Sequence, residues 1–228
     1  MTAIDLRGAT VRLGDRLVLE SVDLSLDHQR IAVIGANGSG KSTFARLLGG
    51  LVSAESGSVS VMGLDPARHS AELRKRVGFV FSNPDAQIIM PTVAEDAAFS
   101  LRGERLPKDV TAERVADALA EFGLSDLAEH PAHDLSGGQK QLLALCAALI
   151  RRPSLVIADE PTAYLDARNA RLIADHLLAD ADRGLVLVTH DLGLAARCDA
   201  AVLFDGGRLA AVGEPGDVIE QYEALLRC

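Results

Sequence analysis

The sequence has few aromatic residues and no long apolar stretch. Aromatic residues make up 4% of the 228 positions, tryptophan is missing, and apolar residues still reach 48%. Because the core must then be built from Leu, Val, Ile and Ala, we expect a parallel sheet covered by helices. The longest apolar run, residues 142–150, is much shorter than the ~20 residues that a membrane span needs. Residues 1–16 contain no apolar signal core. We expect no direct membrane insertion.

Cysteine and positive charge are also scarce. The three cysteines, Cys146, Cys198 and Cys228, have no CxxC spacing, which disfavours a disulfide framework or a zinc site and favours free thiols in a reducing compartment. The net charge of −9 makes nonspecific nucleic-acid binding a poor hypothesis. Only four lysines accompany nineteen arginines, so the position of each lysine is informative.

Hydrophobic patterning predicts alternating strands and helices. Residues 22–26 alternate with period two, as a half-buried antiparallel strand does. Continuous apolar runs predict buried strands at 31–34, 77–81, 155–158 and 185–188. Helices are expected over 41–48, 167–179 and 217–226 and through much of 92–152, and residues 205–207 predict a hairpin turn.

These elements predict one domain over residues 1–228. The approximate subdivisions are an antiparallel β subdomain (1–28), an α/β core (29–90 and 153–228) and an inserted helical subdomain (91–152).

One glycine-rich segment between a predicted strand and a predicted helix matches the pattern of a phosphate-binding loop. Its glycines allow backbone N–H groups to point inward, and the following helix adds its positive end. Lys41 supplies a cation for the outer phosphates, and the Ser42 hydroxyl suits a magnesium ion. The loop consists of Gly35, Ala36, Asn37, Gly38, Ser39, Gly40, Lys41, Ser42 and Thr43. The alternative is an ordinary glycine-rich turn.

Three further polar residues follow predicted strands. Asp159 suits a second magnesium contact, and Glu160 suits a general base that holds the attacking water. His190 could hydrogen-bond the terminal phosphate. Taken alone, an Asp-Glu pair is more often a solvated strand end, and a single histidine among six is more often structural.

The order of motifs resembles the nucleotide-binding subunit of ATP-binding-cassette (ABC) transporters. Leu135, Ser136, Gly137, Gly138 and Gln139 spell the family signature, and Ala163, Leu165 and Asp166 resemble the D-loop. The resemblance implies a P-loop NTPase core with an N-terminal antiparallel β subdomain and an inserted α-helical subdomain. It implies ATP and Mg²⁺ as ligands, with Lys41, Glu160 and His190 catalytic.

The resemblance also implies a head-to-tail pair of cassettes. ATP would lie between the phosphate loop of one copy and the signature of the other, so that ATP binding favours closure of the pair. Both half-sites are present in this chain, which favours a homodimer over a pair with a homologous ATPase.

Two positions depart from the family pattern. Ser82 stands where the Q-loop glutamine is expected, and Gln87 resembles a second glutamine found in one subgroup. A serine hydroxyl is too short to replace the amide without a bridging water. Leu13 stands where an aromatic residue usually stacks on adenine, which predicts modest ATP affinity and weak base selectivity.

Residues 77–99 are similar to ATPases of energy-coupling-factor (ECF) importers, and residues 140–146 and 159–171 look most like the biotin-system ATPase. This implies a transmembrane coupling protein and a substrate-binding membrane protein as partners, and a peripheral location on the cytoplasmic face of the membrane. Ser82, Gln87, Ile88 and Ile89 are expected to line the coupling groove.

Other functions remain open at this stage. Within transport, the rival is a cobalt or nickel importer ATPase. Outside it, the rivals are a soluble cassette ATPase of DNA repair or translation, which a single cassette without a heptad run disfavours, and a regulator that binds nucleotide without hydrolysing it.

Overall fold

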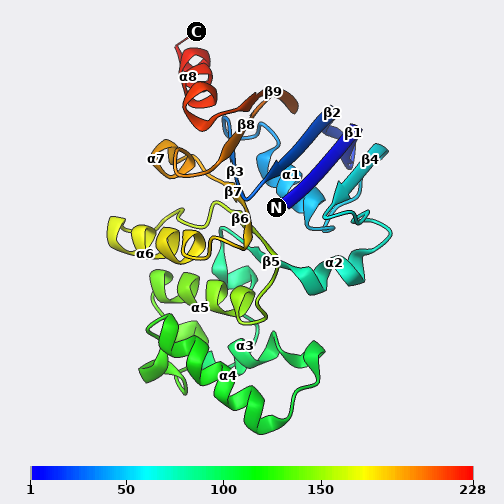
Figure 1. Cartoon of the computed structure of the whole chain (residues 1–228). Helices are drawn as coiled ribbons and strands as arrows, with labels where there is room; N and C mark the ends of the chain where they lie inside the picture. The colour runs from blue at the N-terminus through cyan, green and yellow to red at the C-terminus, as the bar shows by residue number, and fades with distance from the viewer. Residues whose placement is uncertain (1, 228) are drawn as a thin grey trace.

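The computed structural model describes residues 2–227, which form two β-sheets and the helices around them (Figure 1). The larger sheet has six strands in the order β5-β6-β7-β3-β8-β9. All neighbours in it are parallel except β8 and β9, which form an antiparallel hairpin. Its strands are β3 (Arg30–Ile34), β5 (Val77–Val80), β6 (Leu155–Asp159), β7 (Gly184–Val188), β8 (Ala200–Asp205) and β9 (Arg208–Gly213).

The middle strands of this sheet are buried on both faces, as their continuous apolar sequences predict. In β3, Ile31 and Val33 pack into one core while Ala32 and Ile34 pack into the other. The strands β6, β7 and β8 alternate in the same way, so the central sheet separates two hydrophobic cores. Strand β5 ends at Val80, so Phe81 of the predicted strand lies just beyond it.

The smaller sheet is antiparallel and has the order β2-β1-β4. It consists of β1 (Thr2–Leu13), β2 (Arg16–His28) and β4 (Ser56–Val61). The prediction of an alternating strand at residues 22–26 is confirmed, because Val22, Leu24 and Leu26 are buried between exposed neighbours. Ser21 has a left-handed backbone (φ 46°) close to an irregularity in the pairing of β1 with β2.

Helix α1 (Lys41–Leu48) belongs to the hydrophobic core that the two sheets share. Phe44, Leu47 and Leu48 are its buried anchors, and the Phe44 ring lies 5.0 Å from the ring of Phe204 on β8. The bounds predicted for this helix are confirmed. The helix N-terminus is therefore fixed directly after β3, where a bound anion can reach its N–H groups.

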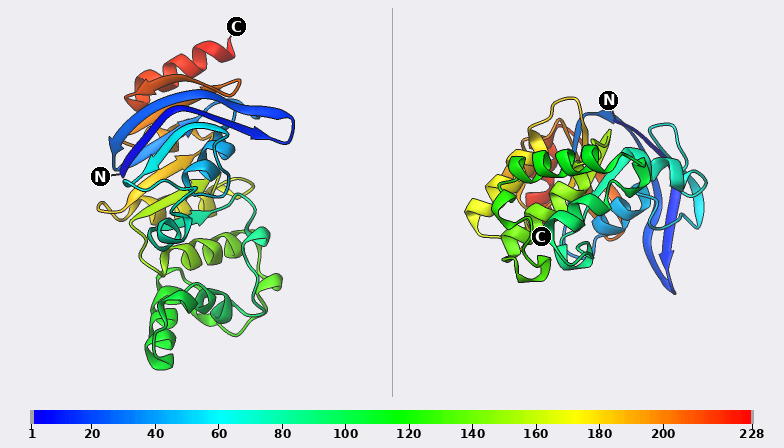
Figure 2. Two further views of the ribbon diagram at one scale, coloured as in Figure 1. Left: turned by 90° about the vertical axis from the view of Figure 1, so that its right-hand side faces the viewer. Right: turned by 90° about the horizontal axis from the view of Figure 1, so that it is seen from below.

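Helix α2 (Ser70–Arg76) packs through Leu73 into the same core as α1, whereas the remaining helices cover the opposite face of the central sheet or lie beyond it (Figure 2). The remaining helices are α3 (Val93–Phe99), α4 (Lys108–Glu121), α5 (Gly137–Leu149), α6 (Ala167–Leu178), α7 (Leu192–Ala195) and α8 (Pro215–Leu226), with 3₁₀ turns at Pro84–Ala86, Arg102–Glu104, Ser125–Leu127 and Ala132–Asp134. No helix within residues 2–227 is long and apolar enough to cross a membrane.

The region predicted as helical, residues 92–152, forms α3, α4 and α5 together with short turns. Helix α5 is more deeply buried than a separate subdomain would require, since Leu143, Leu145 and Cys146 are fully inaccessible. These residues belong to the same core as Val156 and Leu187 of the sheet. Helix α5 therefore joins the helical region to the core.

Candidate functional site

The predicted phosphate loop connects β3 to α1 and needs its glycines for steric reasons. Gly35, Gly38 and Gly40 all have positive φ, at 141°, 79° and 106°. A Cβ on Gly35 would lie 2.1 Å from the carbonyl oxygen of Phe204, and one on Gly40 would lie 2.7 Å from the Leu19 side chain. No other residue fits these two positions without movement of the backbone or its neighbours.

The side chain of Lys41 links the end of this loop to its beginning. Its ammonium donates hydrogen bonds to the carbonyl oxygens of Gly35 (2.7 Å) and Ala36 (2.9 Å). Burial lowers the pKa of Lys41 from its usual value, and the negative charges of Glu160 and Asp159 oppose that shift. A buried ammonium bonded only to two neutral carbonyls is stabilised further when an anion binds to it, so phosphate oxygens are suitable additional partners.

Ser39 supplies a second indication of an anion site. Its side chain is 3% exposed, and its hydroxyl has no hydrogen-bond partner among the described residues. Buried hydroxyl groups are normally paired. The residues of this loop therefore fit a phosphate group.

Asp159 and Ser42 meet beside the loop. The Ser42 hydroxyl donates a 2.8 Å hydrogen bond to the Asp159 carboxylate, which is 2% exposed. Burial raises the pKa of Asp159, while the hydrogen bond from Ser42 acts in the opposite direction. The described residues hold no cluster of three or more His, Cys, Asp or Glu side chains that could bind a metal by themselves. A hydroxyl and one carboxylate do fit Mg²⁺, which keeps waters and takes further oxygens from substrate phosphates.

Glu160 and His190 form the next pair. The His190 Nδ1 atom lies 2.6 Å from a carboxylate oxygen of Glu160. Glu160 does not continue the extended backbone of the strand before it, because its φ is 52° and β6 ends at Asp159. The Glu160 N–H donates to the carbonyl of Val188 on β7 (2.9 Å), and this bond holds the turn beside His190. The side chains of Asp159 and Glu160 therefore take different directions because the backbone turns at Glu160, and not because they alternate along a strand.

Two hollows surround the phosphate loop, and Glu160 borders both. The first, of about 450 Å³, is lined by Leu13, Arg16, Val18, Asn37, Gly38, Gly40, Lys41, Ser42, Thr43 and Glu160. The second, of about 610 Å³, is lined by Gly35, Ala36, Asn37, Ser82, Glu160, Ala163, Tyr164, His190 and Tyr222. The fold therefore brings most of the sequence-predicted nucleotide residues around one loop.

The two candidate Q-loop residues are separated in the structure. Ser82 borders the hollow that contains Glu160 and His190. Gln87 instead lines a different hollow of about 320 Å³. Its amide accepts from the N–H of Phe81 (3.3 Å) and donates to the carbonyl of Ala144 (2.8 Å), so it ties the end of β5 to α5. The expected groove-lining residue Ile89 is 61% exposed, and Ile88 packs on the core.

The signature residues lie apart from this site. None of Leu135–Gln139 lines either hollow at the phosphate loop, and α5, which begins at Gly137, packs on the face of the sheet opposite α1. Ser136 and Gln139 form a capping box, in which each side chain accepts a hydrogen bond from the other's backbone N–H (3.4 and 2.9 Å). The helix N-terminus is thus preformed, but it borders neither hollow at the phosphate loop of its own chain.

The segment that resembles the D-loop, residues 163–166, leads from the hollow with His190 to the start of α6. Ala163 borders the hollow with His190, whereas Asp166 caps α6 by accepting from the N–H of Asn169 (2.8 Å). This hydrogen bond lowers the pKa of Asp166. A Cβ on Gly138 would lie 2.6 Å from the Asn169 amide, so the starts of α5 and α6 touch. Leu165 packs on the core and lines neither hollow.

Sequence reasoning did not assign four residues that line the two hollows, namely Arg16, Val18, Tyr164 and Tyr222. Arg16 was detectable, because it lies three residues after Leu13. Tyr222 was not, since it belongs to the terminal helix α8 and no motif is near it in the sequence.

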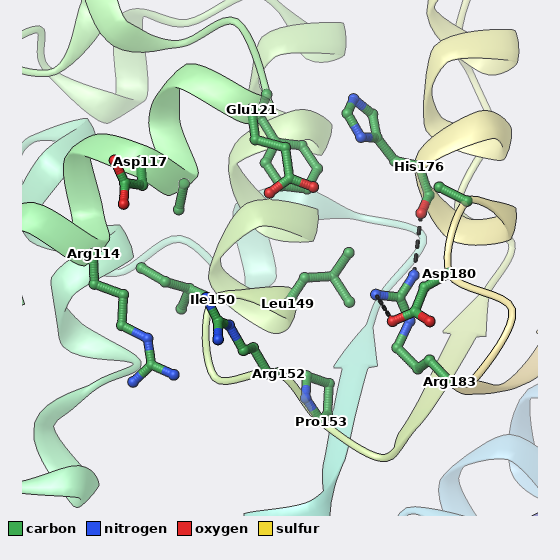
Figure 3. Close-up of a pocket in the computed structure, with 13 residues that line it drawn as sticks. Arg114, Asp117, Glu121, Leu149, Ile150, Arg152, Pro153, His176, Asp180 and Arg183 are labelled. Carbon is green, nitrogen blue, oxygen red and sulfur yellow. Dashed lines mark hydrogen bonds and ion pairs between the residues drawn. The ribbon is translucent and has the colours of Figure 1, made fainter.

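A fourth hollow, of about 340 Å³, lies between α4, the end of α5 and the α6–β7 connection, and shares no lining residue with the two hollows at the phosphate loop (Figure 3). Two of its residues, Arg183 and His176, have contacts that involve α6. Arg183 donates to the carbonyls of His176 (3.1 Å) and Leu177 (3.3 Å) and pairs with Asp180 (3.7 Å). The His176 ring stacks on Phe122 with centroids 4.3 Å apart. These contacts fasten α6 to its neighbours.

The fold and the loop define a P-loop nucleotide hydrolase. The sequence pattern of the ABC transporter family matches residues 19–163. The chain belongs to this family, and it is an ABC ATPase that binds ATP. Relatives 42% and 43% identical, from Deinococcus radiodurans and Bartonella henselae, carry only the general name of ABC transporter ATP-binding proteins.

Three relatives have more specific names. The biotin transport ATP-binding protein BioM of Rhizobium etli is 41% identical over 97% of this chain and 98% of its own. The nickel import ATP-binding protein NikO of Rhodobacter capsulatus is 40% identical over 99% of this chain and 94% of its own. The energy-coupling factor transporter ATP-binding protein EcfA1 of Bacillus subtilis is 36% identical over 93% of this chain and 78% of its own.

Two solved structures share the fold closely. One is cbiO1 from Clostridium perfringens, described as part of the ABC transporter complex cbiONQ, with a TM-score of 0.82 and 28% identity over 98% of this chain and 93% of that chain. The other is a dimer of the ATP-binding cassette MJ0796 in a post-hydrolysis state with ADP and Pi, with a TM-score of 0.80 and 25% identity over 93% and 98%.

Proposed function

We propose that this chain is the ATP-hydrolysing subunit of an ECF-type importer and works as a pair of identical copies. One observation carries the catalytic part of the proposal: the Ser42–Asp159 and Glu160–His190 pairs converge on a single phosphate loop. A nucleotide-binding regulator would need the loop but not a carboxylate–imidazole pair beside it.

The loop and Lys41 hold the phosphates. On binding, phosphate oxygens join the carbonyls of Gly35 and Ala36 as partners of the Lys41 ammonium. Ser42 and Asp159 would hold Mg²⁺, which neutralises charge on the outer phosphates. With these groups in place, the negative charge of the triphosphate no longer repels the carboxylate of Glu160.

Glu160 acts as the general base and His190 as its positioning partner. In this arrangement Nδ1 of His190 donates to Glu160, and a proton on Nε2 lets the other side of the ring donate to the terminal phosphate. The Glu160 carboxylate is 16% exposed and the imidazole 66%, so the carboxylate is sheltered while the ring remains accessible from the hollow. This arrangement suits a carboxylate that accepts a proton from an attacking water.

The second copy supplies what one chain lacks. The capped N-terminus of α5 is preformed, yet it does not border its own phosphate loop. A head-to-tail pair places Ser136, Gly137 and Gly138 of each copy against the terminal phosphate held by the other. ATP then favours the closed pair, and hydrolysis removes the shared contact.

We infer that the cargo is a vitamin, most simply biotin, with nickel or cobalt as the alternative. The similarity of residues 77–99 to ECF ATPases and the relatives named for ECF and biotin transport support this. The nickel-import relative has nearly the same identity, so the ATPase carries little information about cargo. In this proposal, a transmembrane coupling protein docks near Gln87, Ile88 and Ile89, and a separate membrane protein selects the substrate.

The catalytic and transport parts are tested separately. Loss of ATP turnover in Glu160→Gln, with ATP binding retained, supports hydrolysis, whereas equal rates in the variant and the wild type reject it. Cells that lack this chain should lose uptake of labelled biotin while uptake of nickel and cobalt continues. The opposite pattern would assign the chain to metal import. Co-purification with two integral membrane proteins would support the partner assignment.

A further inference from the structure

The tip of the β1–β2 hairpin presents two side chains to the nucleotide hollow. Leu13 and Arg16 are directly paired across the hairpin, with Gly14 at φ 58° in the turn between them. Directly opposed residues of an antiparallel pair lie on the same face, with Cβ atoms about 4.5–5.5 Å apart. Val18, two residues after Arg16, lies on that face as well. All three line the hollow that contains Lys41.

The guanidinium of Arg16 lies close to the phosphate loop. Its Nη2 atom is 4.0 Å from the point that a Cβ on Gly38 would occupy. Within residues 2–227, no hydrogen bond or ion pair joins the side chain of Arg16 to another residue, although the side chain of Arg12 is bonded to Glu55 (3.3 Å). Arg16 is thus a planar cation at the edge of the hollow with its bonding capacity unused.

The hollow lacks any aromatic side chain that could support a purine. Its lining contains one aliphatic residue at the hairpin tip, Leu13, which is 43% exposed. The loop glycines and Lys41 account for the phosphates, so the base is the part of ATP still without a partner. A guanidinium plane stacks on aromatic rings, and an adjacent leucine extends the apolar surface.

We propose that Leu13 and the guanidinium of Arg16 together form the platform on which the purine base stacks. This rests on the proposed function, since it assumes that the loop binds ATP. Arg16 determines nucleotide affinity, and the platform recognises the face of the base and not its edge. ATP and GTP should therefore bind with similar affinity, because every base offers a stacking face.

Equilibrium binding by calorimetry tests the platform with three probes: ATP, GTP and inorganic tripolyphosphate, each with Mg²⁺. In Arg16→Ala, the Kd for ATP and GTP should rise about 5- to 50-fold, the range expected for loss of part of a base-stacking contact. Tripolyphosphate has no base, so its Kd should change less than about twofold. Its retained binding also shows that the variant is folded.

Two further variants separate stacking from charge. Arg16→Lys keeps the charge but loses the plane, and should bind ATP nearly as weakly as Arg16→Ala. Leu13→Tyr combined with Arg16→Ala restores an aromatic surface and should recover most of the ATP affinity. Arg7→Ala is the matched control, because Arg7 is an exposed arginine of the same sheet that does not line the hollow.

The outcomes distinguish this inference from the proposed function. Four results would each overturn the platform. In Arg16→Ala, they are an unchanged affinity for ATP, or an affinity for tripolyphosphate that falls as much as that for ATP. In the other variants, they are full ATP affinity of Arg16→Lys, or no recovery of ATP affinity when Leu13→Tyr is added to Arg16→Ala. If wild type binds neither ATP nor tripolyphosphate, the proposed function itself fails. In steady-state ATPase assays, the platform predicts that Arg16→Ala raises KM for ATP and leaves kcat nearly unchanged.

Discussion

The phosphate-loop half and the signature half of the proposed site differ in how complete each is within one chain. The phosphate-loop half is assembled where three strands end, β3, β6 and β7, and already holds its lysine, its serine–aspartate pair and its glutamate–histidine pair. The signature is a single capped helix start, whose serine and glutamine bond to each other's backbone. The phosphate-loop half needs several residues from different elements already in place, whereas the signature half only has to present the N-terminus of one helix.

This difference predicts where mutations act. Changes in the phosphate-loop half should impair chemistry or metal binding within each copy. Changes in the signature half should spare nucleotide binding by one copy and impair only what requires two copies.

The largest effect is expected for Glu160→Gln. The variant keeps the hydrogen bond to His190 but loses the general base, so ATP turnover should fall about 100-fold or more. ATP-dependent dimers should accumulate, as measured by sedimentation. Glu129→Gln, a change at an exposed acid outside both halves, is the matched control and should turn over normally.

Asp159→Asn should abolish Mg²⁺-dependent turnover without destabilising the fold. Burial raises the pKa of Asp159, which means that the ionised carboxylate costs folding free energy at neutral pH. The asparagine amide still accepts from Ser42. The midpoint of thermal unfolding without nucleotide should therefore stay equal or rise, and a clear fall would show that the carboxylate stabilises the protein.

Gly137→Ala tests the signature half. A Cβ at Gly137 meets nothing within 4 Å in the single chain, and alanine favours helix. The unfolding free energy should be unchanged or higher by up to about 1 kcal/mol. Turnover should nevertheless fall about tenfold or more if the partner's phosphate packs on this position. Normal turnover would argue against a head-to-tail pair.

Ser82→Gln should leave ATPase activity equal or raise it. Ser82 borders the hollow of Glu160 and His190, and a longer amide can reach towards the metal position without an intervening water. Steady-state rates at saturating Mg²⁺ and ATP measure this. A large loss of activity would mean that the hollow has no room for the amide.

The smallest effect is expected outside both halves, at His176. Burial lowers the pKa of this histidine, against the opposing charges of Glu121 and Asp175. The unfolded chain therefore binds a proton first, and this group's contribution to stability declines as pH falls below about 6.5. Urea unfolding at pH 7.5 and 5.5 should show a smaller acid loss in His176→Gln than in wild type. The exposed His133→Gln should behave like wild type.

The sequence predicted the local elements well where a single physical signal dominates. The span of α1, the buried strands and the hairpin around Gly206 follow from apolar runs and glycine positions, and the structure confirms them. The alternation of β2 was also readable. Its continuity through Ser21 was not, because a bulge interrupts the pattern without ending the strand.

The sequence by itself determined the local components of the site. They are a loop whose turns require glycine, a lysine at the start of a helix, two acids at the end of a strand, and a helix that begins with two glycines and is capped by a serine. These depend on local backbone geometry and residue chemistry. Tertiary structure alone decided which parts meet. It turned Glu160 towards His190 through a left-handed backbone, separated Ser82 from Gln87, and placed the hairpin tip with Leu13 and Arg16 over the loop. Such placements depend on how distant segments pack, which no local pattern encodes.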